Sequence, residues 1–203
     1  VAGSYSVSGQ VCFNIKRIYV HESRYEEFVQ RFTDLVDQLV VGPGDSAGVH
    51  LGPLTTEAGY QNGLRLLEHA KKSGYTVHTG GRWQDGFEPG DGWFIRPTVV
   101  TDLPEDDELV MEEQFAPIIP ILPFSNEEDV IRQANRTEYG LASSVWSTNR
   151  DRAVAIAGRI EAGNTFINAH RVGASVPLVP FGGVKQSGLG RNHLHYAVSE
   201  FTE

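Results

Sequence analysis

Cysteine and basic residues are scarce in this chain. Of its 203 residues, Cys12 is the one cysteine, and 17 Lys and Arg stand against 26 Asp and Glu, which gives a net charge of −9. A single thiol excludes an internal disulfide framework and a zinc site built from several cysteines, and it favours the reducing cytoplasm. The acidic balance argues against nucleic-acid and basic membrane-surface partners, because both need a cationic surface. We therefore expect a cytoplasmic protein that binds neither nucleic acid nor membrane.

Long apolar runs and several familiar motifs are also absent from the sequence. No run approaches the roughly 18 residues of a membrane span. There is no G-x-x-x-x-G-K-[ST] phosphate loop and no G-x-G-x-x-G fingerprint between a strand and a helix. The seven histidines show no H-E-x-x-H or similar spacing, so no metal site is predicted, and no G-x-S-x-G elbow is present.

Apolar residues recur with the periods of helices and strands through most of the chain. A capping-box spacing at Ser23 and Glu26 opens an amphipathic stripe that reaches Val40 and is ended by Gly42 and Pro43. The pattern predicts helices over 23–40, 56–72, 125–134 and 150–160, and strands over 17–20, 75–79, 94–100, 118–124, 141–146 and 165–168. Because strands and helices alternate, we expect one α/β domain over 1–203, with a mostly parallel sheet flanked by helices.

The thiol of Cys12 is the first candidate for chemistry. It follows Ser8, Gly9, Gln10 and Val11. A lone cysteine is more commonly a small buried hydrophobe than a reactive group. Gly9 permits a close backbone approach and Gln10 offers amide donors and acceptors, and a thiol near such groups can ionise more readily. The residues alone leave both an inert and a reactive thiol open.

Two further segments combine aromatic residues with polar residues or glycines. Glu112–Pro117 reads E-E-Q-F-A-P, and in an extended chain Glu113 and Phe115 share one face. A carboxylate can hold both hydroxyls of a ribose and a flat ring can pack on a heteroaromatic base, although a solvated acidic turn with one anchoring aromatic fits equally. Phe181–Arg191 is either a flexible glycine loop or a channel wall whose backbone lies close to another segment.

Taken in order, these segments resemble the catalytic part of the NAD(P)-dependent aldehyde dehydrogenase superfamily. S-G-Q-V-C is similar to its nucleophile segment, and E-E-Q-F-A-P to its E-E-x-F-G-P motif, with Ala116 in place of glycine. F-G-G-V-K-Q-S-G-L-G-R is similar to its F-G-G-x-K-x-S-G-x-G-R, and 134–142 and 162–168 also match family patterns. The resemblance covers essentially the whole chain and implies the C-terminal catalytic-domain portion of the family's fold.

The resemblance implies a role for each candidate residue. Cys12 would be the nucleophile that attacks a small-molecule aldehyde and oxidises it to an acid through a thioester. Glu113 would bind the nicotinamide ribose hydroxyls of NAD or NADP, and Phe115 would position the nicotinamide. Phe181 and Phe13 would line the aldehyde tunnel.

A variable loop over 170–179 would close that tunnel and set the substrate preference. Its apolar residues, with the two tunnel rings, favour an apolar or aromatic aldehyde over a charged one. The family's chains also carry a dinucleotide-binding domain, an oxyanion-site asparagine and a general-base glutamate before the nucleophile, and a final strand used in subunit association. Because only eleven residues precede Cys12, we expect a portion of a longer homo-oligomeric enzyme, with little or no activity alone.

Two other functions stay open on the sequence. A cysteine-dependent hydrolase would pair Cys12 with a histidine such as His193 or His195, although no partner pattern is recognisable. A non-catalytic structural or interaction domain would keep the fold without the activity. The joint presence of Cys12, Glu113 and Phe115 argues against this alternative, because a domain that had lost its catalytic function need not retain all three residues.

Overall fold

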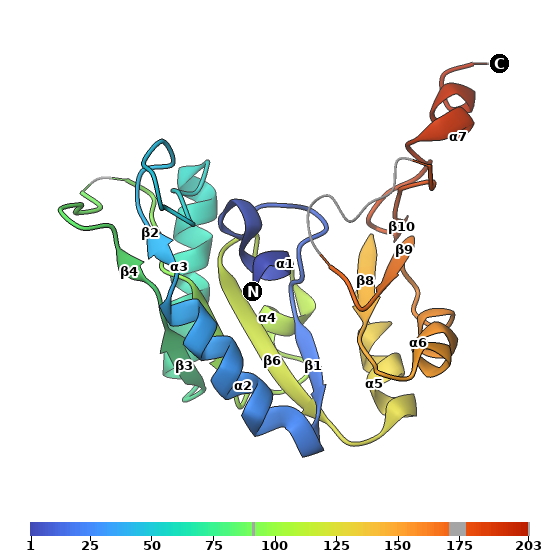
Figure 1. Ribbon diagram of the computed structural model, residues 1–203, viewed down its shortest axis with the longest axis horizontal. Helices are drawn as coiled ribbons and strands as arrows, with labels where there is room; N and C mark the ends of the chain where they lie inside the picture. Colours follow the sequence, from blue (N-terminus) through green and yellow to red (C-terminus); the bar gives the residue numbers. More distant parts are fainter. Residues whose placement is uncertain (91, 171–177, 203) are drawn as a thin grey trace. The chain divides into compact units, whose positions relative to one another are not determined.

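The computed structural model describes residues 1–90, 92–170 and 178–202, with the side chains of all of these except 194–196. They form two compact units, Val1–Ser125 and Asn126–Glu203. In Figure 1 the first unit is coloured from blue to yellow-green and the second from yellow to red. That 1–203 acts as one catalytic domain stays a prediction.

The first unit is built on a four-stranded sheet in the order β1-β6-β5-β3. β1 (Ile18–His21) pairs in parallel with β6 (Ile118–Phe124), and β6 pairs in parallel with β5 (Thr98–Thr101). β3 (Thr76–Thr79) is antiparallel to β5 at the edge. Most of the sheet is therefore parallel, and helices flank it, which confirms the predicted fold class.

Alternate residues of β5 and β6 fill two separate cores. One core joins the strands to α2 (Glu22–Asp37) and includes Val99, Ile119, Ile121, Phe32 and Val36. The other joins them to α3 (Glu57–Lys72) and includes Val100, Ile118, Leu122, Leu66 and Ala70. Because successive side chains of a strand point to opposite sides, α2 and α3 cover opposite faces of the sheet.

Helix α2 begins and ends at different residues from those predicted. Its N-cap is His21, whose ring nitrogen accepts from the backbone amide of Ser23 at 3.2 Å, so the capping box at Ser23 is wrong. The helix stops at Asp37 because the next apolar residues, Val40–Val41, form β2, which is parallel to β4 (Arg82–Trp83). Both valines are buried, and β-branched side chains pack well in strands.

Three short helical elements of the first unit were also not predicted. They are α1 (Ala2–Tyr5), the 3₁₀ helix η1 (Ser6–Gly9) and α4 (Glu108–Met111). Elements of four residues carry too little periodicity to be recognised in a sequence. They matter here because η1 leads into Cys12 and α4 leads into Glu113.

The second unit contains a pair of parallel strands with helices beside them. β8 (Ala142–Val145) pairs with β9 (Asn164–Ile167), and α6 (Arg150–Ala157) connects them. Helix α5 (Glu127–Ala134) is capped by Asn126 rather than by the predicted Ser125. The remaining elements are β7 (Tyr139–Gly140), its antiparallel partner β10 (Val184–Lys185), and α7 (Leu194–Ser199).

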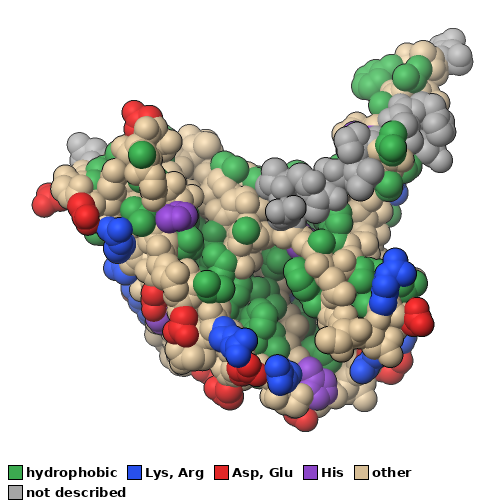
Figure 2. Space-filling model, in the orientation of Figure 1, with side chains coloured by type: hydrophobic (Ala, Val, Ile, Leu, Met, Phe, Trp, Pro, Cys, Tyr) green, Lys and Arg blue, Asp and Glu red, His purple; other side chains and the backbone are tan. Residues whose placement is uncertain are grey.

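Charged side chains of both signs are distributed over the surface. On the face drawn in Figure 2, Lys and Arg are interspersed with Asp and Glu. Some form ion pairs within one helix, such as Arg31 with Glu27 at 2.9 Å in α2. Among the described residues, no helix is long and apolar enough to cross a membrane.

Candidate functional site

The backbone just before Cys12 is held in a strained conformation. Val7 and Ser8 have positive φ angles of 51° and 55°, and Gly9 follows with 82°. A positive φ costs a residue with a side chain about 1–2 kcal/mol, so other contacts must hold the segment. Ser8 Oγ donates to the carbonyl of Gly52 at 2.8 Å, and Gln10 Oε1 accepts from the backbone amide of Thr55 at 2.9 Å.

Cys12 lies in a tight turn that follows this strained segment. The amide of Asn14 donates to the carbonyl of Val11 at 2.9 Å, which closes the turn around Cys12 and Phe13. The side-chain amide of Asn14, a buried residue, donates to the carbonyl of Ser6 at 2.8 Å. Cys12 itself is exposed and in no disulfide, so it is not a small buried hydrophobe.

The second candidate segment follows the short helix α4. Gln114 is buried, whereas Glu113 and Phe115 on either side are exposed, and this alternation fits the predicted shared face. The side-chain amide of Gln114 donates to the carbonyls of Leu109 and Lys16, the latter at 3.1 Å. Phe115 has a positive φ of 47°, and its ring is 38% exposed. A buried amide therefore anchors the segment and leaves the acid and the ring outside.

Gly9 is the point at which these two segments meet. A Cβ atom on Gly9 would lie 2.4 Å from the carbonyl oxygen of Ala116. The absence of a side chain thus allows the backbone before Cys12 to lie against the backbone after Phe115. The close backbone approach predicted for Gly9 is confirmed.

Lys16 links the same two segments through its side chain. Its ammonium nitrogen donates to the carbonyl of Gly9 at 2.7 Å and lies 4.6 Å from the centroid of the Phe115 ring. Burial lowers the pKa of Lys16 to about 8, while the negative charges of Glu113 and Cys12 act in the opposite direction. The structure therefore brings together Cys12, Glu113 and Phe115, with Lys16 among them.

Ala116 replaces a glycine of the family motif without strain. The positive φ angle occurs one residue earlier, at Phe115, and Ala116 does not adopt one. Its side chain is buried and packs in the core beneath α3. A methyl group is therefore accommodated at this position.

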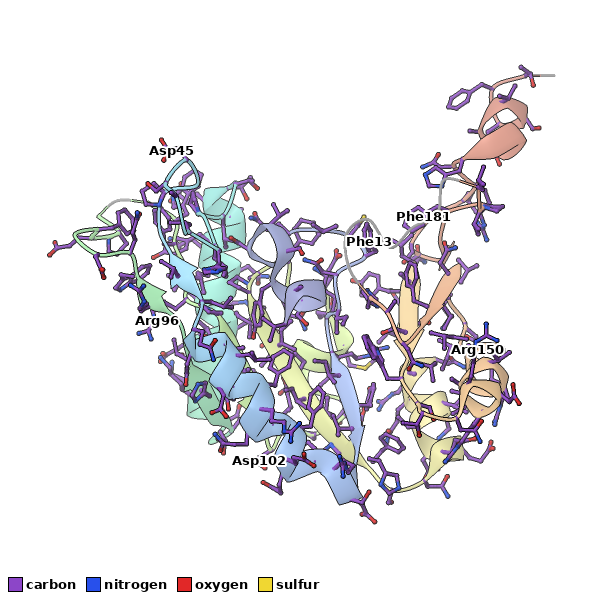
Figure 3. The ribbon with its side chains drawn as sticks, in the orientation of Figure 1. Phe13, Asp45, Arg96, Asp102, Arg150 and Phe181 are labelled. Carbon is purple, nitrogen blue, oxygen red and sulfur yellow. The ribbon has the colours of Figure 1, made fainter. Side chains whose placement is uncertain are left out.

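The two predicted tunnel residues, Phe13 and Phe181, belong to different units of the chain. Phe13, labelled in Figure 3, follows Cys12 in the turn and is half-buried. Phe181 belongs to the second unit, where its backbone exchanges hydrogen bonds with Asn192 at 3.0 and 2.7 Å and its ring lies 6.1 Å from that of His193. Of loop 170–179, residues 171–177 lie outside the described part, as does the side chain of His195.

The glycines after Phe181 make close backbone contacts within the second unit. A Cβ atom on Gly182 would lie 2.5 Å from the carbonyl oxygen of Gly190. This contact lies within the segment, and a Cβ atom on Gly163 would clash with the carbonyl of Gly182, so the segment also lies close to another part of the unit. That it forms a channel wall stays a prediction. Among the described residues, no group of three or more His, Cys, Asp or Glu side chains is placed to hold a metal ion.

A buried carboxylate positions α4 and with it the segment that carries Glu113. Asp107 caps the helix, its Oδ1 accepting from the Leu109 amide at 2.9 Å, while Oδ2 contacts the His69 ring and the Tyr75 hydroxyl, both at 2.8 Å. Burial alone would raise the pKa of Asp107, but hydrogen bonds from His69, a backbone amide and Tyr75 hold it below its ordinary value.

We expect D107N to lower the free energy of unfolding by about 1–3 kcal/mol at pH 7, because His69, Tyr75 and the Leu109 amide lose an ionised acceptor. A lowered folded-state pKa stabilises the protein above the unfolded-state pKa, and this contribution is lost as the pH falls through the folded-state value. Urea unfolding at several pH values should therefore show the difference shrinking in acid. D106N, at an exposed neighbour, is the control, and an equal loss in both variants would contradict the assignment.

Comparisons with known proteins identify the family to which this chain belongs. The family model described as the aldehyde dehydrogenase family matches residues 1–203, and the chain belongs to that family. Phenylacetaldehyde dehydrogenase of Pseudomonas fluorescens is 36% identical over 195 residues, which are 96% of this chain and 38% of that protein. Betaine aldehyde dehydrogenase of Brucella anthropi is 36% identical over 204 residues, 99% of this chain and 41% of that protein.

Solved structures show the same fold. An NAD+ complex of aldehyde dehydrogenase from Bacillus cereus matches with a TM-score of 0.89 and 34% identity, covering 100% of this chain and 40% of that one. Mycobacterium tuberculosis aldehyde dehydrogenase complexed with NAD+ matches with a TM-score of 0.90 and 36% identity, covering 100% and 41%. The chain thus spans about two fifths of the length of these relatives.

Sequence reasoning missed Lys16 and Gln114, which join the two segments. Gln114 occupies the variable position of the family motif, so the motif assigns it no role. Lys16 had one signal, since it is a cation between the apolar Ile15 and the β-branched and aromatic run that begins the first strand. Its contacts with Gly9 and Phe115 depend on tertiary structure and have no signature in local spacing.

Proposed function

We propose that this chain is the nucleophile-bearing part of an enzyme that oxidises an aldehyde to a carboxylic acid with NAD or NADP. The observation that carries the proposal is the exposed thiol of Cys12, which follows Gly9, whose backbone lies against Ala116 at the end of the Glu113–Phe115 segment. Membership of the aldehyde dehydrogenase family supports it. The names of the relatives indicate aldehyde oxidation. We expect this activity in the complete protein that carries these 203 residues.

Cys12 supplies the covalent step of the proposed reaction. Its thiolate sulfur forms a bond to the carbonyl carbon of the aldehyde, and the π electron pair of that carbonyl moves to oxygen. The backbone amide of Cys12 is proposed to stabilise the resulting oxyanion; removing one such donor typically costs about 2.7–4 kcal/mol. After oxidation of the carbon to the thioester level, water cleaves the carbon–sulfur bond, which releases the acid and restores the thiolate.

Glu113 and Phe115 fit the nicotinamide end of the cofactor. The exposed carboxylate of Glu113 has two acceptor oxygens, which match the two hydroxyl donors of a ribose. The exposed part of the Phe115 ring offers a flat apolar surface for a heteroaromatic ring. When bound, NAD or NADP supplies the acceptor for the hydride that leaves the substrate carbon.

Phe13 and Phe181 are proposed to contact the substrate side chain. Phe13 follows the nucleophile directly in the turn, and its half-buried ring is compatible with a tunnel wall. An apolar or aromatic aldehyde suits two phenylalanine rings better than a charged one. We further propose that the protein is a homo-oligomer in the cytoplasm. Residues outside these 203 would hold the adenosine of the cofactor.

The test is an assay of the complete protein that carries these 203 residues. We expect formation of NADH or NADPH that depends on an added aldehyde, with phenyl-bearing aldehydes oxidised faster than carboxylate-bearing ones. A hydrolase would instead cleave an ester without cofactor and lose this activity in H193A. Ester cleavage lost in H193A, together with no cofactor reduction by any aldehyde, would overturn the proposal in favour of that alternative.

A further inference from the structure

Lys16 has an unusual environment for a lysine. It is partly buried at the start of the first strand, where a long, charged side chain would ordinarily reach solvent. Instead its ammonium donates to the carbonyl of Gly9 at 2.7 Å and lies 4.6 Å from the Phe115 ring centroid. One side chain thus contacts both segments of the proposed active site.

We propose that Lys16 is a positioning residue of the Cys12 site, whose positive charge holds the two segments together and stabilises the Cys12 thiolate. The inference rests on the proposed function and deepens it, because it names the charged group that prepares the nucleophile. Lys16 acts through Gly9, Phe115 and Cys12, so no contact with substrate is required of it.

The charged groups that face Lys16 support this role. Glu113 and Cys12 both interact electrostatically with its ammonium, and each negative charge favours the protonated amine. A positive charge near a thiol generally favours its ionised form, which is the physical basis of the proposal. The pKa of about 8 means that Lys16 is mostly charged at pH 7 and mostly neutral above pH 9. The stabilisation is therefore present near neutral pH and fades in alkaline solution.

The test separates the charge of Lys16 from its hydrogen bond. K16Q keeps a donor for the Gly9 carbonyl but carries no charge, whereas K16R keeps both. K71Q removes an exposed lysine on α3 and serves as the matched control. The measurement is the rate of iodoacetamide alkylation of the Cys12 peptide, followed by mass spectrometry in the complete protein from pH 6.5 to 9.5.

We expect K16Q to slow alkylation at pH 7 by about three- to tenfold, while K16R and K71Q stay within about twofold of the unchanged protein. The ratio between the unchanged protein and K16Q should approach one by pH 9.5, because the Lys16 amine becomes neutral and its charge no longer distinguishes the two proteins. A purely structural role would give a ratio that does not depend on pH. Equal rates for K16Q and K71Q at pH 7, or a pH-independent ratio, would overturn the inference.

The electrostatic interaction between Lys16 and Cys12 can also be measured through the pKa of Lys16. This measurement tests the inference even if K16Q does not fold. Competitive acetylation with trace acetic anhydride reports the pKa of a single lysine from its labelled peptide. We expect that pKa to fall in C12S, because the thiolate no longer stabilises the ammonium, and an unchanged value would contradict the coupling. Full aldehyde oxidation by C12S would refute the proposed function, whereas an inactive C12S with an unaffected Lys16 would refute this inference alone.

Discussion

We expect replacement of Cys12 by serine to lower kcat for the proposed aldehyde oxidation by the complete protein by about a thousandfold or more. A serine hydroxyl occupies nearly the same volume in the exposed turn, but it is far less ionised than a thiol at neutral pH and is a poorer nucleophile. Steady-state formation of NADH or NADPH with a saturating aldehyde measures the effect.

The matched control for this variant is S6A, on the same loop and away from the proposed chemistry. Ser6 Oγ donates to the carbonyl of Ala2 at 2.7 Å, so its loss perturbs the start of η1 without removing the thiol. We expect S6A to retain at least about a third of the activity, since an exposed hydrogen bond contributes about 0.5–1.5 kcal/mol to stability. Activity of C12S comparable with that of S6A would show that another group performs the covalent step.

We expect substitution of Gly9 by alanine to destabilise the first unit by about 2–5 kcal/mol. An added Cβ atom would stand 2.4 Å from the carbonyl oxygen of Ala116, and the φ angle of 82° is itself unfavourable for alanine. The two segments must separate to relieve the clash, so the Cys12 turn and Phe115 move apart. Urea unfolding measures the stability, and alkylation of Cys12 reports the change at the thiol.

Gly74 provides the control for the glycine substitution. Its φ angle is 79°, nearly that of Gly9, but a Cβ atom there would meet no other atom within 4 Å. G74A therefore costs about 1–2 kcal/mol from the backbone alone, and the difference between the two variants isolates the close approach to Ala116. If G9A were no more destabilising than G74A, the close approach of Gly9 to Ala116 would not contribute to stability as we propose.

Elements with long apolar periods could be predicted from the sequence, but not all of their ends could. The helix after Thr56 and the strand Ile118–Phe124 have the predicted bounds, because a threonine cap and a long run of buried residues act locally. The end of α2 at Asp37 depends instead on the pairing of Val40–Val41 with Arg82–Trp83. That pairing lies some forty residues away in the chain, where no local pattern reports it.

In the candidate site too, some features could be predicted from the sequence and others could not. The alternation at Glu113 and Phe115 follows from local geometry and fits the structure. Gly9 permits a close backbone approach, but its partner Ala116 is distant in the sequence and could not be predicted. The positive φ angles of Val7 and Ser8 could not be predicted, because these residues ordinarily avoid that conformation. Lys16 was missed for a related reason, since its partners are a carbonyl and a ring brought to it by folding.

The most direct measurement is rapid acid quenching of the complete protein during its first turnover of an aldehyde with NAD or NADP, followed by mass spectrometry of the Cys12 peptide. The account predicts that the acyl group of the substrate appears on this peptide and disappears at rates that match turnover. Turnover during which the Cys12 peptide stays unmodified while an acyl group accumulates on another residue would contradict it.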